Sequence, residues 1–251
     1  MMKKWLSLLF IGLSFIGFSQ TQEELYKKGV QLMDTYQSKE AYEVFTKLYD
    51  IDPNNADYAA RLSSSCSRYG VSMPTEAEKF KYYEKAEDLA KKAIALDNKN
   101  AEAHFAYALA LGRINENASS KQKIANAKLI KTEAEKTIAL DPRHAGAYHV
   151  LGRYHKTIAG FNAMEKAMIN AFFGGVPEGG TYEDAENAFI MCCKLEPDYI
   201  LHFYELADTY RLNKKVELAK AVLKKALQIK VTTEEDKKRY KNCQELLEDI
   251  S

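Results

Sequence analysis

A short phrase that ends helices recurs along this chain, and it constrains the fold more than any other feature. It reads IDP at residues 51–53, LDP at 140–142, LEP at 195–197 and, with Asn in place of Pro, LDN at 96–98. Three of the five prolines therefore occupy one recurring site. Because proline cannot continue a helix, each phrase predicts the end of a repeated helical unit.

The residues ahead of each phrase repeat as well. An alanine lies twelve residues before the end of the phrase at Ala41, Ala86 and Ala185, and an aromatic side chain follows four residues later at Phe45 and Phe189. Each such stretch follows another amphipathic stretch with a small residue where two helices must approach closely, and these residues are Gly29, Ser63, Ala108, Gly152 and Ala207. A helical bundle without repeats would show only the 3.6-residue periodicity.

The spacing predicts five helix pairs, at residues 22–55, 56–100, 101–144, 145–199 and 200–233. This pattern resembles the tetratricopeptide repeat, a helix–turn–helix unit of about 34 residues. Units two, three and four carry about 11, 10 and 21 extra residues, which we expect to lengthen the connections between their two helices. Since one pair cannot bury its apolar face alone, the predicted fold class is all-α, a right-handed α-solenoid with one concave groove.

A capping helix is expected at residues 234–250, after the last pair. Its apolar stripe comprises Tyr240, Cys243, Leu247 and Ile250 at helical spacing. Thr232 and Glu235 are expected to form the capping box that begins this helix. With its other face polar, such a helix would close the end of the array. The predicted repeat domain therefore spans residues 20–251.

A longer stretch in the fourth unit allows a narrower comparison. It runs from LGR at residues 151–153 through IAG at 158–160 and FFGGVP at 172–177 to TYEDAENAF at 181–189. This resembles the regulator of microtubule dynamics family, whose repeat domains carry a similar insertion between the helices of one unit. The resemblance covers residues 101–230 well and the first two units loosely. It implies a helical repeat fold and an adaptor role, with eukaryotic members associated with microtubules and organelle membranes, and it implies no catalytic residue.

The amino terminus has the three parts of a signal peptide. Lys3 and Lys4 precede an apolar stretch from Trp5 to Phe18, and the small residues Gly17 and Ser19 suit cleavage before Gln20. As a helix, the stretch would span roughly 21 Å against a hydrocarbon core of about 30 Å. We therefore expect residues 1–19 to be a signal peptide and the mature protein to be exported, periplasmic or secreted. The alternative is a membrane anchor, with residues 5–18 retained. An exported chain would not meet cytoplasmic microtubules, so it would share the fold of the family without its partner.

Composition and spacing argue against several kinds of chemistry. A net charge of +1 gives no general reason to expect a nucleic acid partner, and four cysteines are too few for a disulfide scaffold. No two of the five histidines have the three- or four-residue helical spacing of a metal motif. The glycine-rich segment 174–180 lacks the Lys-Ser/Thr ending of a phosphate loop, which favours a turn between helices. We expect buried thiols at Cys66, Cys192 and Cys243, with Cys193 the more accessible one.

Arginines are concentrated on the first helices of the units. The chain has seven arginines against 29 lysines, and five of the seven lie on the first helices of units two to five. Alignment of the repeats predicts ten residues that line the concave groove: Tyr26, Arg68, Phe105, Leu109, Arg113, His149, Arg153, Lys156, Tyr204 and Arg211. Because the guanidinium group pairs with carboxylates and stacks on rings, the groove is expected to bind an acidic or carboxylate-ended peptide. The alternative is that these cations form ion pairs within the array, for instance with Asp57, Glu102, Glu205 or Asp208.

The functional expectation is a protein-binding scaffold without catalytic activity, cofactor or metal. Its partner would be a protein or an acidic peptide, with no nucleic acid or small-molecule substrate, and a membrane only if the amino-terminal segment is retained. An enzyme that uses Cys193 or a histidine is the third alternative.

Overall fold

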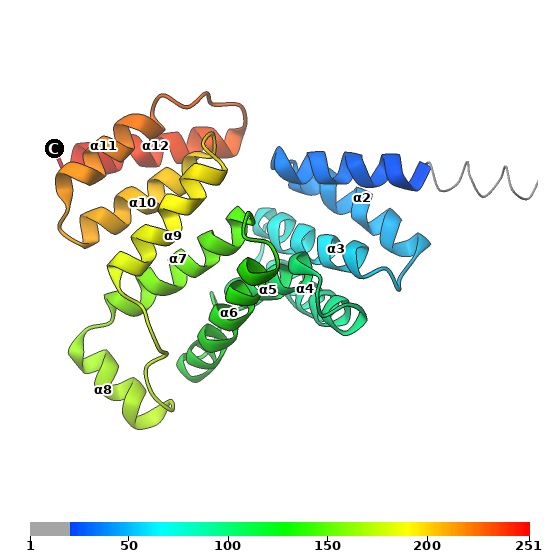
Figure 1. Cartoon of the computed structure of the whole chain (residues 1–251), viewed down its shortest axis with the longest axis horizontal. Coiled ribbons are helices and arrows are strands. Elements are labelled where there is room, and N and C mark those ends of the chain that lie inside the picture. The colour runs from blue at the N-terminus through cyan, green and yellow to red at the C-terminus, as the bar shows by residue number, and fades with distance from the viewer. Residues whose placement is uncertain (1–20) are drawn as a thin grey trace, which may run out of the picture. The chain divides into compact units, whose positions relative to one another are not determined.

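The computed structural model describes residues 21–251, and within that range every regular element is helical (Figure 1). The fold class predicted from the repeats, an all-α solenoid, is confirmed. None of the described helices is long and apolar enough to cross a membrane. The predicted signal peptide at residues 1–19 lies outside the described residues.

After a helix at residues 21–34, the elements are α2 (Ser38–Ile51), α3 (Ala56–Tyr69), the 3-10 turn η1 (Gly70–Ser72), α4 (Glu76–Leu96), α5 (Ala101–Ile114), α6 (Ser120–Leu140), α7 (Ala145–Gly160), α8 (Ala163–Phe172), α9 (Tyr182–Leu195), α10 (Ile200–Leu212), α11 (Val216–Ala226) and α12 (Glu234–Asp249).

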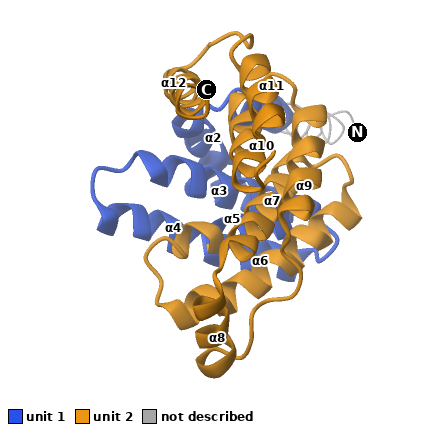
Figure 2. Cartoon of the chain, turned by 90° about the vertical axis from the view of Figure 1, so that its left-hand side faces the viewer, with its two compact units in different colours: residues 1–110 blue, residues 111–251 orange. Residues whose placement is uncertain are grey.

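The chain divides into two compact units, Met1–Ala110 and Leu111–Ser251 (Figure 2). In unit 1, α3 packs against both α2 and α4. In unit 2, α9 packs against α7 and α10, and α10 packs in turn against α11 and α12. Helices α3, α9 and α10 thus each contact the partner of their own pair and a helix of a neighbouring pair, as stacked repeats require.

The recurring phrase forms the same turn each time. Helices α2, α4, α6 and α9 each end at the residue before the acidic one. The carboxylates of Asp52, Asp97 and Asp141 accept a hydrogen bond from the backbone N–H two residues later, at 3.1, 2.9 and 2.9 Å. In three cases the next helix then begins at a side-chain cap, which is Asn55, Asn100 or His144. The acidic residue therefore closes one helix while a polar residue three positions later opens the next.

Glycine and aromatic residues set the close approaches within pairs. A Cβ atom on Gly29 would lie 2.8 Å from the ring of Phe45, and one on Gly152 would lie 2.8 Å from the ring of Phe189. Both rings are completely buried. A larger side chain at either glycine would push the two helices apart, so the repeated small residue has a steric cause.

The extra residues of the second and third predicted helix pairs, at residues 56–100 and 101–144, lengthen a helix more than a connection. Helices α4 and α6 have 21 residues each, whereas α2 and α9 have 14. The connections that precede α4 and α6 are only residues 70–75 and 115–119. Thr75 and Ser119 cap the two long helices early, and residues 76–95 and 120–139 contain neither glycine nor proline to break them.

The insertion of the fourth predicted helix pair, between α7 and α9, consists of a helix and a glycine-rich loop. Helix α8 exposes Met164, Met168 and Phe172 on one side, and Ile169 is buried. Gly174, Gly175, Gly179 and Gly180 all have positive φ, between 74° and 96°. The hydroxyl of Tyr154 donates to the carbonyl of Glu178 at 2.7 Å, which ties the loop to α7.

The capping box of α12 lies one residue later than expected. Thr233, and not Thr232, is the N-cap, and its hydroxyl accepts from the backbone N–H of Asp236 at 3.0 Å. The Asp236 carboxylate accepts in return from the backbone N–H of Thr233 at 3.1 Å. The prediction of Thr232 with Glu235 was wrong because a shorter acid at the third helical position also completes a box. Cys243 and Leu246 are buried against the helices of the last pair.

Candidate partner-binding surfaces

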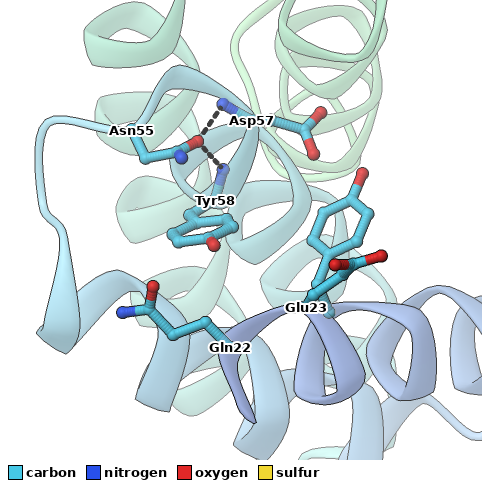
Figure 3. A pocket seen from close by; sticks show the side chains of 6 residues that line it. Gln22, Glu23, Asn55, Asp57 and Tyr58 are labelled. Carbon is cyan, nitrogen blue, oxygen red and sulfur yellow. Dashed lines mark hydrogen bonds between the residues drawn. The ribbon is translucent and has the colours of Figure 1, made fainter. Parts of the chain in front are cut away.

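Tyr26 lies at a shallow pocket in unit 1. The pocket has a volume of about 340 Å³ and is lined by Gln22, Glu23, Tyr26, Asn55, Asp57 and Tyr58 (Figure 3). The amide oxygen of Asn55 accepts from the backbone N–H groups of Asp57 and Tyr58, which fixes the first turn of α3 beside it.

The Tyr26 hydroxyl is engaged inside the protein. It accepts from Arg61 Nε at 2.8 Å, and Arg61 Nε also donates to Asp57 at 3.0 Å. Burial and the hydrogen bond to Asp57 raise the pKa of Tyr26 to about 12. With two carboxylates and two tyrosine side chains among its lining residues, this pocket suits a cationic or hydrogen-bond-donating group better than a carboxylate.

The other predicted groove residues of unit 1 are less accessible than expected. Arg68 donates to the carbonyl of Met33 at 3.1 Å and lies over the ring of Tyr36. Phe105 is 3% exposed, so its ring packs in the interior, and Leu109 is half-buried.

In unit 2, the charged residues of α7 and α10 form one network. Lys156 on α7 pairs with Glu205 and, at 3.2 Å, with Asp208, both on α10. Arg211 donates to the same Asp208 carboxylate through Nε at 3.0 Å. The Glu205 side chain is 9% exposed and that of Lys156 is 17% exposed, so the network is largely buried. Ion pairs within the array, the alternative interpretation, are therefore observed for Lys156 and Arg211 as well as Arg61.

Arg153 differs from its neighbours. Its residue is exposed, and among residues 21–251 no carboxylate pairs with it. Arg113 donates to Glu116 at 3.3 Å, while its Nε atom is buried without a hydrogen-bond partner in the described chain. Tyr204 is half-buried on α10, against the core of the last pairs. The carboxylate-binding hypothesis thus depends mainly on Arg153.

His149 is half-buried, and its ring contacts other side chains of unit 2. Its Nδ1 lies 3.1 Å from Nδ1 of His202, and its ring meets the edge of Phe189 at 5.7 Å between centroids. Cys192 of α9 completes the group, because one ligand atom from each of the three residues lies within 4.8 Å of the others. Burial, His202 and nearby cations, Arg153 foremost, hold the pKa of His149 well below its ordinary value.

The histidine–cysteine group is the feature that spacing along the sequence did not reveal. Its members come from three helices, so no short motif joins them. The repeat register contained the signal, since α9 packs against both α7 and α10 in a stacked array. Combining that register with the residue types would have placed the three side chains together.

All four cysteines are free thiols, and three of them are buried as expected. Cys193 is half-buried among the apolar residues of unit 2. Burial raises the pKa of Cys193 to about 12, so its thiol is protonated at neutral pH. Cys193 is the most accessible of the four thiols, as expected, but in its protonated form it is a poor nucleophile at neutral pH.

The paired helices, their acid-closed turns and the glycine–aromatic contacts define the class: this is a tetratricopeptide-type α-solenoid. A thermophilic TPR protein from Thermus thermophilus has the same fold, with a TM-score of 0.62 at 16% identity over 89% of this chain and 98% of that one.

Within that class, the chain belongs to the family described as regulator of microtubule dynamics protein 1-3, whose model matches residues 25–251. The match includes the first two predicted helix pairs, for which the sequence resemblance was loose. Regulator of microtubule dynamics protein 1 of Bos taurus is 29% identical over 98% of this chain and 82% of its own length. The Rattus norvegicus protein is 33% identical over 68% of this chain and 55% of its own length.

Proposed function

We propose that the chain is a non-enzymatic adaptor that binds a partner protein through the exposed side of its first helices. Membership in a family of regulators and a repeat fold of this kind support a protein-binding role. The observation that carries the choice of surface is Arg153, an exposed guanidinium without an internal counterion among the described residues.

The chemistry of the partner follows from that charge. Lys156 and Arg211 are neutralised by Glu205 and Asp208, so they add little to the field that an incoming peptide meets. An unpaired guanidinium can accept a carboxylate in a two-pronged geometry, which makes an acidic or carboxylate-ended segment the expected ligand.

Charge reversal at Arg153 tests this surface. Wild-type chain immobilised in native extract should capture a partner that the Arg153→Glu variant loses. Arg143→Glu is the matched control, because Arg143 is also exposed in unit 2 and its only hydrogen bond there is through its backbone N–H to Asp141. Arg113→Glu is a poorer probe, since it would place a carboxylate at a partly buried position. Equal capture by wild type and Arg153→Glu, with equal helicity, would remove Arg153 from the binding surface.

The compartment is a separate part of the proposal. Lys3, Lys4, the apolar stretch from Trp5 to Phe18 and the small residues Gly17 and Ser19 support export followed by cleavage. The family name points instead to a microtubule-related partner, which a cytoplasmic or membrane-anchored chain could reach. The mass of the native protein decides between them: a chain that begins at Gln20 supports export, and a chain that retains residues 5–18 supports the anchored adaptor.

A further inference from the structure

Three helices of unit 2 bring two imidazoles and a thiol to one point. His149 lies on α7, Cys192 on α9 and His202 on α10, and one ligand atom of each lies within 4.8 Å of the other two. Cys192 is completely buried and His202 is 2% exposed. These side chains are held where α9 packs against its two neighbours, so packing of the helices keeps them together.

We propose that His149, Cys192 and His202 bind one zinc ion, through Nδ1 of each histidine and Sγ of the cysteine, with water in the fourth position. Imidazole nitrogen and thiolate sulfur are the donors that zinc takes in proteins. Two nitrogens each about 2.05 Å from a tetrahedral zinc lie about 3.3 Å apart. The two Nδ1 atoms here are 3.1 Å apart, close to that separation.

Glu196 supplies the support that a zinc-bound histidine needs. Nε2 of His202 donates to the Glu196 carboxylate at 2.8 Å, which leaves Nδ1 of the same ring without its proton and directed at His149. A histidine that ligates a metal commonly donates its other ring N–H to a carboxylate in this way. Glu196 is therefore a positioning residue for the site and not a ligand.

The charges balance around the ion. Zinc binding expels the thiol proton of Cys192 to solvent, and the thiolate together with the Glu196 carboxylate then offsets the two positive charges of the metal. Without the ion, the Cys192 thiol faces the carbonyl of Ala145 at 3.5 Å, a weak hydrogen bond that is readily exchanged. A histidine–histidine hydrogen bond alone would account for the two rings but would leave the thiol with only its weak bond to Ala145.

Cobalt spectroscopy of the purified full-length chain tests the site directly. Cobalt(II) added to metal-free protein should give one equivalent of bound ion, a thiolate-to-cobalt charge-transfer band and the intense visible bands of tetrahedral coordination. Zinc should displace the cobalt and raise the melting temperature. Wild-type protein purified without added metal should contain zinc.

Matched variants separate this site from other thiols and imidazoles. Cys192→Ala should abolish the charge-transfer band, whereas Cys66→Ala, a buried thiol in unit 1, should keep it. His202→Ala should lose binding, and His155→Ala, a buried histidine outside the group, should retain it. Glu196→Ala should weaken zinc binding about 10–100-fold.

Three results would overturn the proposal. They are a wild-type chain that gives no charge-transfer band with cobalt, a band that persists in Cys192→Ala, and copper in place of zinc in the purified protein. The wild-type spectrum is informative even if a variant does not fold. Because these measurements need no partner, their failure leaves the adaptor function untouched.

Discussion

Gly152 of α7 lies so close to Phe189 of α9 that a Cβ atom added to the glycine would come within 2.8 Å of the ring. The same contact joins Gly29 and Phe45 in unit 1. In both pairs a glycine on one helix leaves room for an aromatic ring of the partner helix. Burial of that ring stabilises the pair.

Alanine at position 152 should therefore destabilise the protein although alanine favours helix. We expect Gly152→Ala to cost about 1–3 kcal/mol through overpacking against the Phe189 ring, measured by urea unfolding. Gly112→Ala is the matched control, because it lies within α5 and a Cβ there meets nothing within 4 Å. That control should stabilise by about 0.5–1 kcal/mol. Stabilisation by both variants would contradict the close packing of α7 and α9.

Lys156 neutralises two acidic side chains of α10. Lys156→Met should leave Glu205 and Asp208 together without their shared cation, and we expect a loss of about 2 kcal/mol in the free energy of unfolding. Lys237→Met serves as the comparison, because Lys237 and its partner Glu234 are 63% and 87% exposed. Its effect should stay below about 0.5 kcal/mol. Equal effects of the two substitutions would show that the α7–α10 network contributes no more than a surface pair.

The register of the capping box is tested at two adjacent threonines. Thr233→Ala removes the acceptor for the backbone N–H of Asp236 and should cost about 1 kcal/mol. Thr232→Ala removes only a side-chain hydrogen bond to the Asp236 carboxylate, so thermal unfolding should change by less than half as much. A larger loss from Thr232→Ala would restore the register expected from the sequence.

Buried thiols should make the fold sensitive to alkaline pH. Burial raises the pKa of Cys66 to about 12, so the folded protein keeps this proton at a pH where the unfolded chain releases it. The unfolding free energy should be unaffected below about pH 8.5 and should fall between about pH 9 and 12, by up to about 1.4 kcal/mol per pH unit for each such thiol.

Urea unfolding across that pH range, with Cys66→Ala beside wild type, isolates the contribution of one thiol. The variant should start less stable because of the cavity but decline with a shallower slope. If wild type and Cys66→Ala lost stability with the same pH slope, the pKa of Cys66 would be the same in the folded and the unfolded chain.

Much of the fold could be predicted because its determinants are local. The acid-closed turns, the small residues such as Gly152 and the paired helices follow from residue types at fixed offsets. The lengthened α4 and α6 were harder to predict, because an early N-cap at Thr75 or Ser119 extends a helix into what spacing alone describes as a connection. The N-cap of α12 has a similar local cause, because Thr232 and Thr233 are both able to cap the helix and Thr233 does so.

The candidate site was less predictable because it depends on contacts between helices. The sequence placed Lys156 and Arg211 on the binding face, but whether a cation stays free depends on the acids opposite it, Glu205 and Asp208. His149 was likewise expected in the groove, whereas its contacts are with His202 and Phe189. Side-chain pairing across helices decides these roles, and no spacing along one helix contains that information.

Photo-crosslinking beside Arg153 tests the central claim, that the exposed face of the first helices binds a partner protein. A photoreactive amino acid would replace exposed Thr157, one turn from Arg153 on α7, in one variant and exposed Lys237 of α12 in another, each expressed in its native host. The account predicts a defined covalent adduct with one protein from position 157 and none from position 237. Adducts from position 237 alone, or the same adducts from both positions, would contradict it.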